Sequence, residues 1–171
     1  ASVAKTFTAV CVLRLVDDGR LSFDDPIEPH LPDDLRALLV GAVDRPTRDA
    51  ITIDRLLRHI SGLHDFGRDP EYGRRVGRDP HHVWTAAELV ELALRNGPLV
   101  AAPGERFHYS DTGFTLLAGA VEHHTGTPLP VAYRDLVDYE RIGLTHTWLE
   151  GREPAPADAP VPARGLRARC G

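Results

Sequence analysis

The chain has 171 residues, of which 42% are hydrophobic and 26% charged, as in an ordinary globular domain. This composition excludes a collagen, a coiled coil and a wholly disordered chain, and no apolar run approaches the roughly 18 residues of a membrane span. The 20 basic and 25 acidic residues give a net charge of −5, which argues against nucleic acid as the main partner.

The first predicted element is a helix over residues 2–18, which Gly19 ends. Apolar side chains cover nearly its whole circumference, so we expect a buried, central helix. Residues 20–50 are rich in Asp and Pro and are expected to be mostly loop. Thr52 is a suitable cap for a short helix that runs through His59.

The middle of the chain continues as alternating loop and helix. Residues 65–82 have the pattern of a polar surface loop. Thr85 and Glu88 form a T-x-x-E capping box that begins a helix over 86–95. An apolar helix is expected over 113–124, and few segments have the pattern of a strand.

Towards the C-terminus, a further helix is expected over 129–140. Residues 151–171 are rich in Pro and Ala, which is typical of an extended tail or linker. The sequence therefore predicts one domain over 1–150 followed by this tail.

Ser2 and Lys5 are the first candidates for chemistry, because a spacing of three places them on one face at the start of a helix. Free N–H groups at a helix N-terminus stabilise negative charge. A serine hydroxyl needs an adjacent base, and a lysine held among apolar groups has a lowered pKa and can act as one. Lys5 is also the only lysine in the chain. The competing interpretation is a helix-capping serine followed by a surface lysine.

The S-x-x-K pattern is the nucleophile motif of serine β-lactamases and penicillin-binding proteins. Four segments extend the match in the correct order: SVAKTFTAVCVLRLVDDGRLSFDDPI at 2–27, ITIDRLLRHISGL at 51–63, PGERFHYSDTGFTLLAGAVEHHTG at 103–126 and IGLTHTWL at 142–149. The chain therefore resembles the class C β-lactamase-like serine hydrolases. This family includes β-lactamases, D-alanyl-D-alanine carboxypeptidases and β-lactamase-fold esterases.

The resemblance implies an acyl-transfer site. Ser2 would be the acylated nucleophile, Lys5 its base partner, and Tyr109 the residue that passes protons to the leaving group and the hydrolytic water. A nearby ammonium stabilises a phenolate, which makes this role for Tyr109 chemically reasonable.

Asp111 departs from the family pattern, which has an Asn that donates to the substrate amide and contacts the lysine. An ionised Asp111 can only accept hydrogen bonds, and it would hold Lys5 protonated. As a substrate-binding residue, Asp111 is easier to reconcile with ester hydrolysis than with β-lactam or peptide chemistry.

The sequence thus predicts a serine hydrolase acting by acyl transfer on esters or amides. Two alternatives stay open: a β-lactamase or D-alanyl-D-alanine carboxypeptidase, and a non-catalytic binding or scaffold relative or inactive fragment. The resemblance implies the α+β, β-lactamase/transpeptidase-like fold, of which this chain would cover mainly the helical lobe and lack most of the antiparallel sheet. Because no K-T-G strand follows Asp111, we expect residues 1–171 to be incomplete and inactive alone.

No organic cofactor is implied. No metal site is expected either, because the adjacent histidines at 81–82 and at 123–124 point to different sides and chelate poorly. The expected partner is a small-molecule ester, amide or β-lactam, with no nucleic acid and no membrane span. The resemblance implies a periplasmic or secreted protein, with the cytoplasm and the oligomeric state left open.

Overall fold

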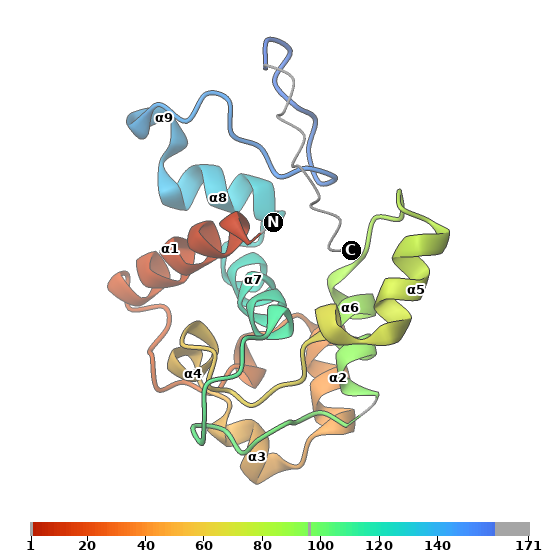
Figure 1. Ribbon diagram of the computed structural model, residues 1–171. Coiled ribbons are helices and arrows are strands. Elements are labelled where there is room, and N and C mark those ends of the chain that lie inside the picture. The colour runs from red at the N-terminus through yellow and green to blue at the C-terminus, as the bar shows by residue number, and fades with distance from the viewer. Residues whose placement is uncertain (1, 96, 160–171) are drawn as a thin grey trace.

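The computed structural model describes residues 2–95 and 97–159, which fold into helices joined by short loops (Figure 1). These residues include no β-strand, and their only bridges are the isolated antiparallel pairs Pro26–Thr52 and Leu63–Leu99. None of their helices is long and apolar enough to cross a membrane. The helices, in chain order, are α1 (Val3–Asp17), the 3₁₀ helix η1 (Glu28–His30), α2 (Asp33–Ala42), α3 (Arg45–Ala50), α4 (Ile53–Leu57), the 3₁₀ helix η2 (Phe66–Arg68), α5 (Pro70–Arg78), α6 (Ala86–Leu94), α7 (Asp111–Thr125), α8 (Leu129–Val137) and α9 (Tyr139–Ile142).

Helix α7 lies at the centre of this arrangement and packs against α1, α4, α6 and α8 (Figure 1). Leu116, Leu117 and Ala120 are fully buried, so its burial supplies much of the hydrophobic core. The helix ends at Gly126, which has a φ of +67° as a left-handed C-terminal residue requires. It therefore offers a rigid platform for the residues at its N-terminal end.

Helix α1 has the predicted boundaries, with Ser2 at the N-cap. The expectation that it is buried on all sides is wrong for the described part of the chain. Cys11 and Leu15 are fully buried against α7 and α8, whereas Val3 is 67% exposed and Leu13 is 44% exposed. The reason is that these two helices cover only one side of α1.

The prediction of loop over residues 20–50 is also wrong, because this segment contains η1, α2 and α3. Leu35 and Leu39 lie one turn apart on α2 and are both buried. Asp44 caps α3 by accepting a hydrogen bond from the backbone N–H of Thr47 at 3.1 Å. The many Asp and Pro residues thus begin helices here instead of preventing them.

Residues 65–82 were expected to be a surface loop but contain η2 and α5. The Asp69 carboxylate accepts the Glu71 N–H at 2.7 Å at the start of α5, and Pro70 occupies the first helical position. Glu71 then pairs with Arg74 and Arg75. No residue of α5 is buried, so the predicted surface location is correct for this helix, whereas Asp65, Phe66 and Asp69 before it are buried.

Helices α4 and α6 begin at their predicted caps, and α7 begins two residues before its predicted start. Thr52 caps α4, which ends at Leu57, and both hydrogen bonds of the capping box between Thr85 and Glu88 are present at α6. The helix expected over 129–140 is divided into α8 and α9 at Asp138, which has a φ of +61°. The first residues of the expected tail contact the helical part of the chain, because Glu153 pairs with Arg134 of α8 and Arg152 donates to the Trp84 carbonyl in the loop before α6. The boundary at 150/151 stays a prediction, and residues 160–171 lie outside the described part.

Candidate active site

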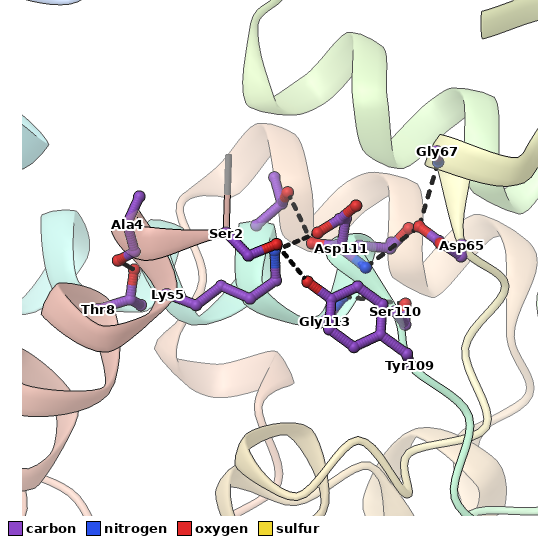
Figure 2. A network of polar contacts seen from close by, with 12 residues as sticks. Ser2, Ala4, Lys5, Thr8, Asp65, Gly67, Tyr109, Ser110, Asp111 and Gly113 are labelled. Carbon is purple, nitrogen blue, oxygen red and sulfur yellow. Dashed lines mark hydrogen bonds and ion pairs between the residues drawn. The ribbon is translucent and has the colours of Figure 1, made fainter. Parts of the chain in front are cut away.

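The N-terminus of α1 and the N-terminus of α7 meet at one polar network (Figure 2). Ser2 is the N-cap of α1, and Tyr109 lies two residues before α7 begins. The Ser2 Oγ and the Tyr109 hydroxyl are 2.7 Å apart, within hydrogen-bond distance. The structure therefore brings together two predicted site residues that are 107 positions apart in the sequence.

The Ser2 hydroxyl does not cap helix α1. A capping serine accepts a hydrogen bond from the second or third N–H of the helix, but Ser2 makes no such side-chain bond. Its hydroxyl contacts Tyr109 instead, and the residue is exposed. Lys5 is not a surface lysine either, since its side chain is only 19% exposed. Both observations argue against the interpretation of a structural cap followed by a surface lysine.

Lys5 donates to the Asp111 carboxylate in an ion pair that joins α1 to α7. Its Nζ also lies 5.1 Å from the centre of the Tyr109 ring and 5.7 Å from that of Phe114. Burial lowers the pKa of Lys5, but the hydrogen bonds and charges of Asp111 and Tyr109 outweigh this effect and raise the pKa above 10.5. The expectation of a lowered Lys5 pKa is therefore wrong, and Lys5 is an ammonium at neutral pH.

Asp111 is the first residue of α7 and is held there by its backbone. Ser110 caps the helix by accepting the Gly113 N–H at 3.3 Å. The Asp111 N–H itself donates to Asp65 Oδ1 at 3.1 Å, and the Gly67 N–H donates to the same oxygen at 3.1 Å (Figure 2). Asp65 is only 4% exposed. Nothing in the local sequence pattern marks Asp65, because its partner Asp111 lies 46 residues away.

His59 is a second site residue that the sequence pattern did not predict. Its ring stacks on that of Tyr109, with centroids 4.4 Å apart and an interplanar angle of 28°. It comes from the segment ITIDRLLRHISGL, which carries part of the family resemblance, and that segment was the available signal.

The loop after α4 pairs with the segment that leads towards Tyr109. The Gly104 N–H donates to the Ile60 carbonyl at 2.7 Å, and the Val100 N–H donates to the Gly62 carbonyl at 2.9 Å. Gly62 has a φ of +75°, and a Cβ there would run into the Ala101 carbonyl. A glycine is therefore required at this close approach.

A cavity of about 310 Å³ opens beside the ion pair. Lys5 and Asp111 line it together with mostly apolar side chains, among them Phe114 and Leu129. Ser2 and Tyr109 do not line this cavity, and Lys5 is the residue that connects it to their contact. No group of three His, Cys, Asp or Glu residues within 2–95 and 97–159 is placed to hold a metal ion.

Comparison with solved structures identifies the fold. The D-stereospecific amidohydrolase from Streptomyces sp. matches with a TM-score of 0.78 and 30% identity, over 94% of this chain and 46% of that one. The D-amino acid amidase from Ochrobactrum anthropi SV3 matches with a TM-score of 0.70 and 29% identity, over 91% and 40% of the two chains. The fold is thus the β-lactamase/transpeptidase-like fold, of which the described residues form a helical part.

The beta-lactamase family model matches residues 1–169, and the chain belongs to this family. Esterase EstB of Burkholderia gladioli is 36% identical over 160 residues, which are 90% of this chain and 38% of EstB. A putative D-alanyl-D-alanine carboxypeptidase of Escherichia coli K12 is 30% identical over 145 residues, which are 82% of this chain and 30% of that protein. The chain therefore spans between about a third and a half of the length of these relatives and neighbours.

Proposed function

We propose that this chain carries the nucleophile site of a serine hydrolase that cleaves an ester or amide by acyl transfer to Ser2. The observation that carries the proposal is the 2.7 Å contact between Ser2 Oγ and the Tyr109 hydroxyl, beside the Lys5 ammonium. The similarity to an esterase and to amidases supports the same class of reaction.

In the first half of the reaction, Ser2 Oγ attacks the carbonyl carbon of the substrate and gives its proton to the Tyr109 oxygen. Tyr109 acts as a phenolate, which the Lys5 ammonium stabilises through its positive charge. The tetrahedral intermediate then collapses, and the bond between the carbonyl carbon and the leaving oxygen or nitrogen breaks. Tyr109 returns the proton to the leaving alcohol or amine, and an acyl-Ser2 remains.

In the second half, a water molecule attacks the acyl carbon while Tyr109 takes its proton. The bond to Ser2 Oγ breaks, and the proton returns to Ser2. The sum of both halves converts one ester or amide and one water into an acid and an alcohol or amine. No cofactor takes part in these steps.

Lys5 has an electrostatic role in this scheme and is not the direct base. Its raised pKa and its ion pair with Asp111 keep it charged over the physiological range, and an ammonium has no lone pair with which to accept a proton. The hydroxyl in contact with Ser2 is that of Tyr109. The proton path therefore runs between two oxygens, and Lys5 favours the state in which Tyr109 is negative.

Asp111 favours esters among the candidate substrates. An ionised carboxylate can accept but not donate, so it offers nothing to a substrate carbonyl oxygen. Its Oδ1 is already occupied by Lys5. A β-lactam or a D-alanyl peptide needs an Asn side chain of the enzyme to bind its amide group. Asp111 does not provide that contact.

Covalent labelling tests the proposal in the full protein that carries this chain. A serine-directed acylating probe should label Ser2, as located by mass spectrometry of the labelled peptide. Ser2→Ala should abolish labelling, and Lys5→Ala, which removes the charge that stabilises the Tyr109 phenolate, should slow it by about 10²–10³-fold. Ser22→Ala is the matched control, because Ser22 is exposed but lies outside the polar network, and it should label at the wild-type rate. Labelling that survives Ser2→Ala refutes the nucleophile assignment, and a wild-type protein that no probe labels is a non-catalytic relative.

A further inference from the structure

We infer that His59 is a positioning residue for Tyr109, and that its neutral imidazole keeps the Tyr109 hydroxyl on Ser2. The inference rests on the proposed function, in which Tyr109 carries the proton. It adds a residue that does not touch the substrate and a reason for the site to lose activity in acid.

Three contacts connect His59 to Tyr109 and to both of its chain neighbours. The rings of His59 and Tyr109 stack with centroids 4.4 Å apart. The Ser110 N–H donates to His59 Nδ1 at 3.2 Å, and the His108 N–H donates to the His59 carbonyl at 2.7 Å. One residue thus holds the backbone on either side of Tyr109 as well as its ring, which leaves the phenol little freedom to leave Ser2.

The His59 ring is itself held in place. It packs against Phe114 with centroids 5.0 Å apart and edge-on against Phe107 at 5.9 Å. Its backbone has a φ of +56°, a conformation that few residues other than glycine adopt, with His, Asn and Asp the best tolerated. A residue at this position must therefore accept the left-handed backbone and present both a flat ring and a hydrogen-bond acceptor, and histidine meets all three requirements.

The hydrogen bond from the Ser110 N–H determines the protonation state in which His59 holds Tyr109 in place. Nδ1 accepts the Ser110 N–H only through a free lone pair, so the proton of the neutral ring sits on Nε2. Protonation of Nδ1 turns it into a donor that faces another donor. The hydrogen bond beside Tyr109 is then lost, and the ring carries a positive charge.

The charged groups around His59 come from several elements. Lys5 on α1 opposes a second positive charge on His59, and His108 opposes one when it is protonated. Asp111 on α7 and Asp65 on the loop after α4 favour it. Burial and the Lys5 charge outweigh the two carboxylates, so the pKa of His59 lies below 6.5. The contact between His59 and the Ser110 N–H is therefore intact at neutral pH and is lost as the pH falls below the His59 pKa.

The test compares the pH dependence of Ser2 acylation in wild-type protein and in His59→Asn, using the full protein that carries this chain. Asn tolerates the left-handed backbone and offers an oxygen to the Ser110 N–H, but it has no ring and does not titrate. We expect acylation at about pH 8 to fall by about 10- to 100-fold, as is typical of a reacting group displaced by about 1 Å. The ratio of variant to wild-type rate should then rise as the pH falls, by up to tenfold for each pH unit below the wild-type His59 pKa.

This ratio isolates His59, because all other titrating groups are common to both proteins. His81→Asn provides the control, since His81 is exposed and lies outside the polar network, and it should keep the wild-type profile. A ratio that does not change with pH overturns the inference. Loss of labelling in Ser2→Ala, measured in parallel, shows that the proposed function itself holds, so the two failures are distinguishable.

A measurement on the wild-type protein covers the case in which His59→Asn does not fold. Nitrogen NMR of the histidine rings reports the tautomer and the pKa of each one. We expect His59 to be the Nε2–H tautomer with a pKa below the ordinary histidine value of about 6.5. An Nδ1–H tautomer, or a pKa of His59 at or above this ordinary value, overturns the inference.

Discussion

The Lys5 ammonium and the Asp111 carboxylate form an ion pair across 106 residues of sequence, joining the first turn of α1 to the first residue of α7. Their side chains are only 19% and 31% exposed, so solvent screens the pair less than it would on the surface. The pair keeps Lys5 charged beside the Tyr109 ring, and Asp111 stands where the family pattern has an Asn.

Replacing Asp111 by Asn should change the choice of substrate. The substitution removes the negative charge that helps to raise the Lys5 pKa, and it adds an N–H₂ donor for a substrate amide. We expect the ratio of amide to ester turnover to rise by about tenfold, the effect of one hydrogen bond to a polar group that is otherwise left unpaired. Steady-state kcat/KM for a matched ester and amide pair measures this ratio.

The matched control is Asp33→Asn, because Asp33 pairs with Arg36 on the surface with its side chain 91% exposed. This variant should leave the ratio unchanged. If Asp111→Asn also leaves it unchanged, Asp111 does not contact the substrate amide.

Asp65→Asn should destabilise the fold by about 1–3 kcal/mol, the cost of leaving a buried polar group unsatisfied. Asp65 Oδ1 accepts the N–H groups of both Asp111 and Gly67, and its Oδ2 lies 3.7 Å from Arg68 Nε. An amide in this place keeps one acceptor oxygen and directs a donor at groups that are themselves donors. Urea unfolding of wild type and variant gives the free-energy difference.

Asp44→Asn is the control for Asp65→Asn. Asp44 also accepts backbone N–H groups as a helix cap, but it is exposed, and Asn caps helices about as well as Asp. The free energy of unfolding should therefore change little. Equal losses in the two variants would mean that burial of Asp65 adds nothing.

The fold was predictable from sequence where a cap residue stands directly before an apolar helical pattern. Thr85 with Glu88 predicted α6, and Thr52 predicted α4, at their observed starts. Helix α2 was missed because its short apolar stretch lies within a segment, 20–50, that is rich in Asp and Pro. Leu35 and Leu39, one turn apart, are its buried residues. Its stability comes from packing on α6, a contact that local propensity does not report.

The candidate site was predictable to a similar extent. The spacing of Ser2 and Lys5 is a local property of one helix, so the sequence alone placed them on one face. Tyr109 entered only through the family resemblance, because no local pattern connects residues 107 positions apart. His59 and Asp65 act through the way the loop after α4 lies against the start of α7, which only the folded chain defines.

The free energy of unfolding should fall as the pH drops below about 6.5, because of two neighbouring histidines, His30 and His124. His30 Nδ1 and His124 Nε2 are 2.9 Å apart, so one proton serves both nitrogens. Burial lowers the pKa of both rings, more than the attraction of Asp25 raises it. The unfolded chain then binds more protons than the folded one below the unfolded value of 6.5, and unfolding becomes easier as the pH falls through the folded values.

Unfolding midpoints in urea, measured between about pH 8 and pH 5, check this prediction. His124→Gln removes one titrating ring and should flatten the dependence. His146→Gln should not, because His146 is exposed with its side chain 45% accessible, and its partners Thr145 and Asp158 are also exposed. A wild-type midpoint that stays constant from pH 8 to pH 5 would contradict the assignment.

Gly62→Ala should both destabilise the fold and slow the acylation of Ser2. Its φ of +75° costs an alanine about 1–2 kcal/mol, and the clash of the new Cβ with the Ala101 carbonyl adds about 1–3 kcal/mol. The clash displaces the loop that pairs with residues 98–104, and these lead directly into the Tyr109 segment.

Gly126→Ala separates the two effects, because Gly126 has a similar φ of +67° but nothing within 4 Å of the added Cβ. This control should lose only the smaller amount of unfolding free energy and should acylate at the wild-type rate. Equal losses in both variants would show that the loop after α4 yields freely at Ala101 and does not hold Tyr109 in place.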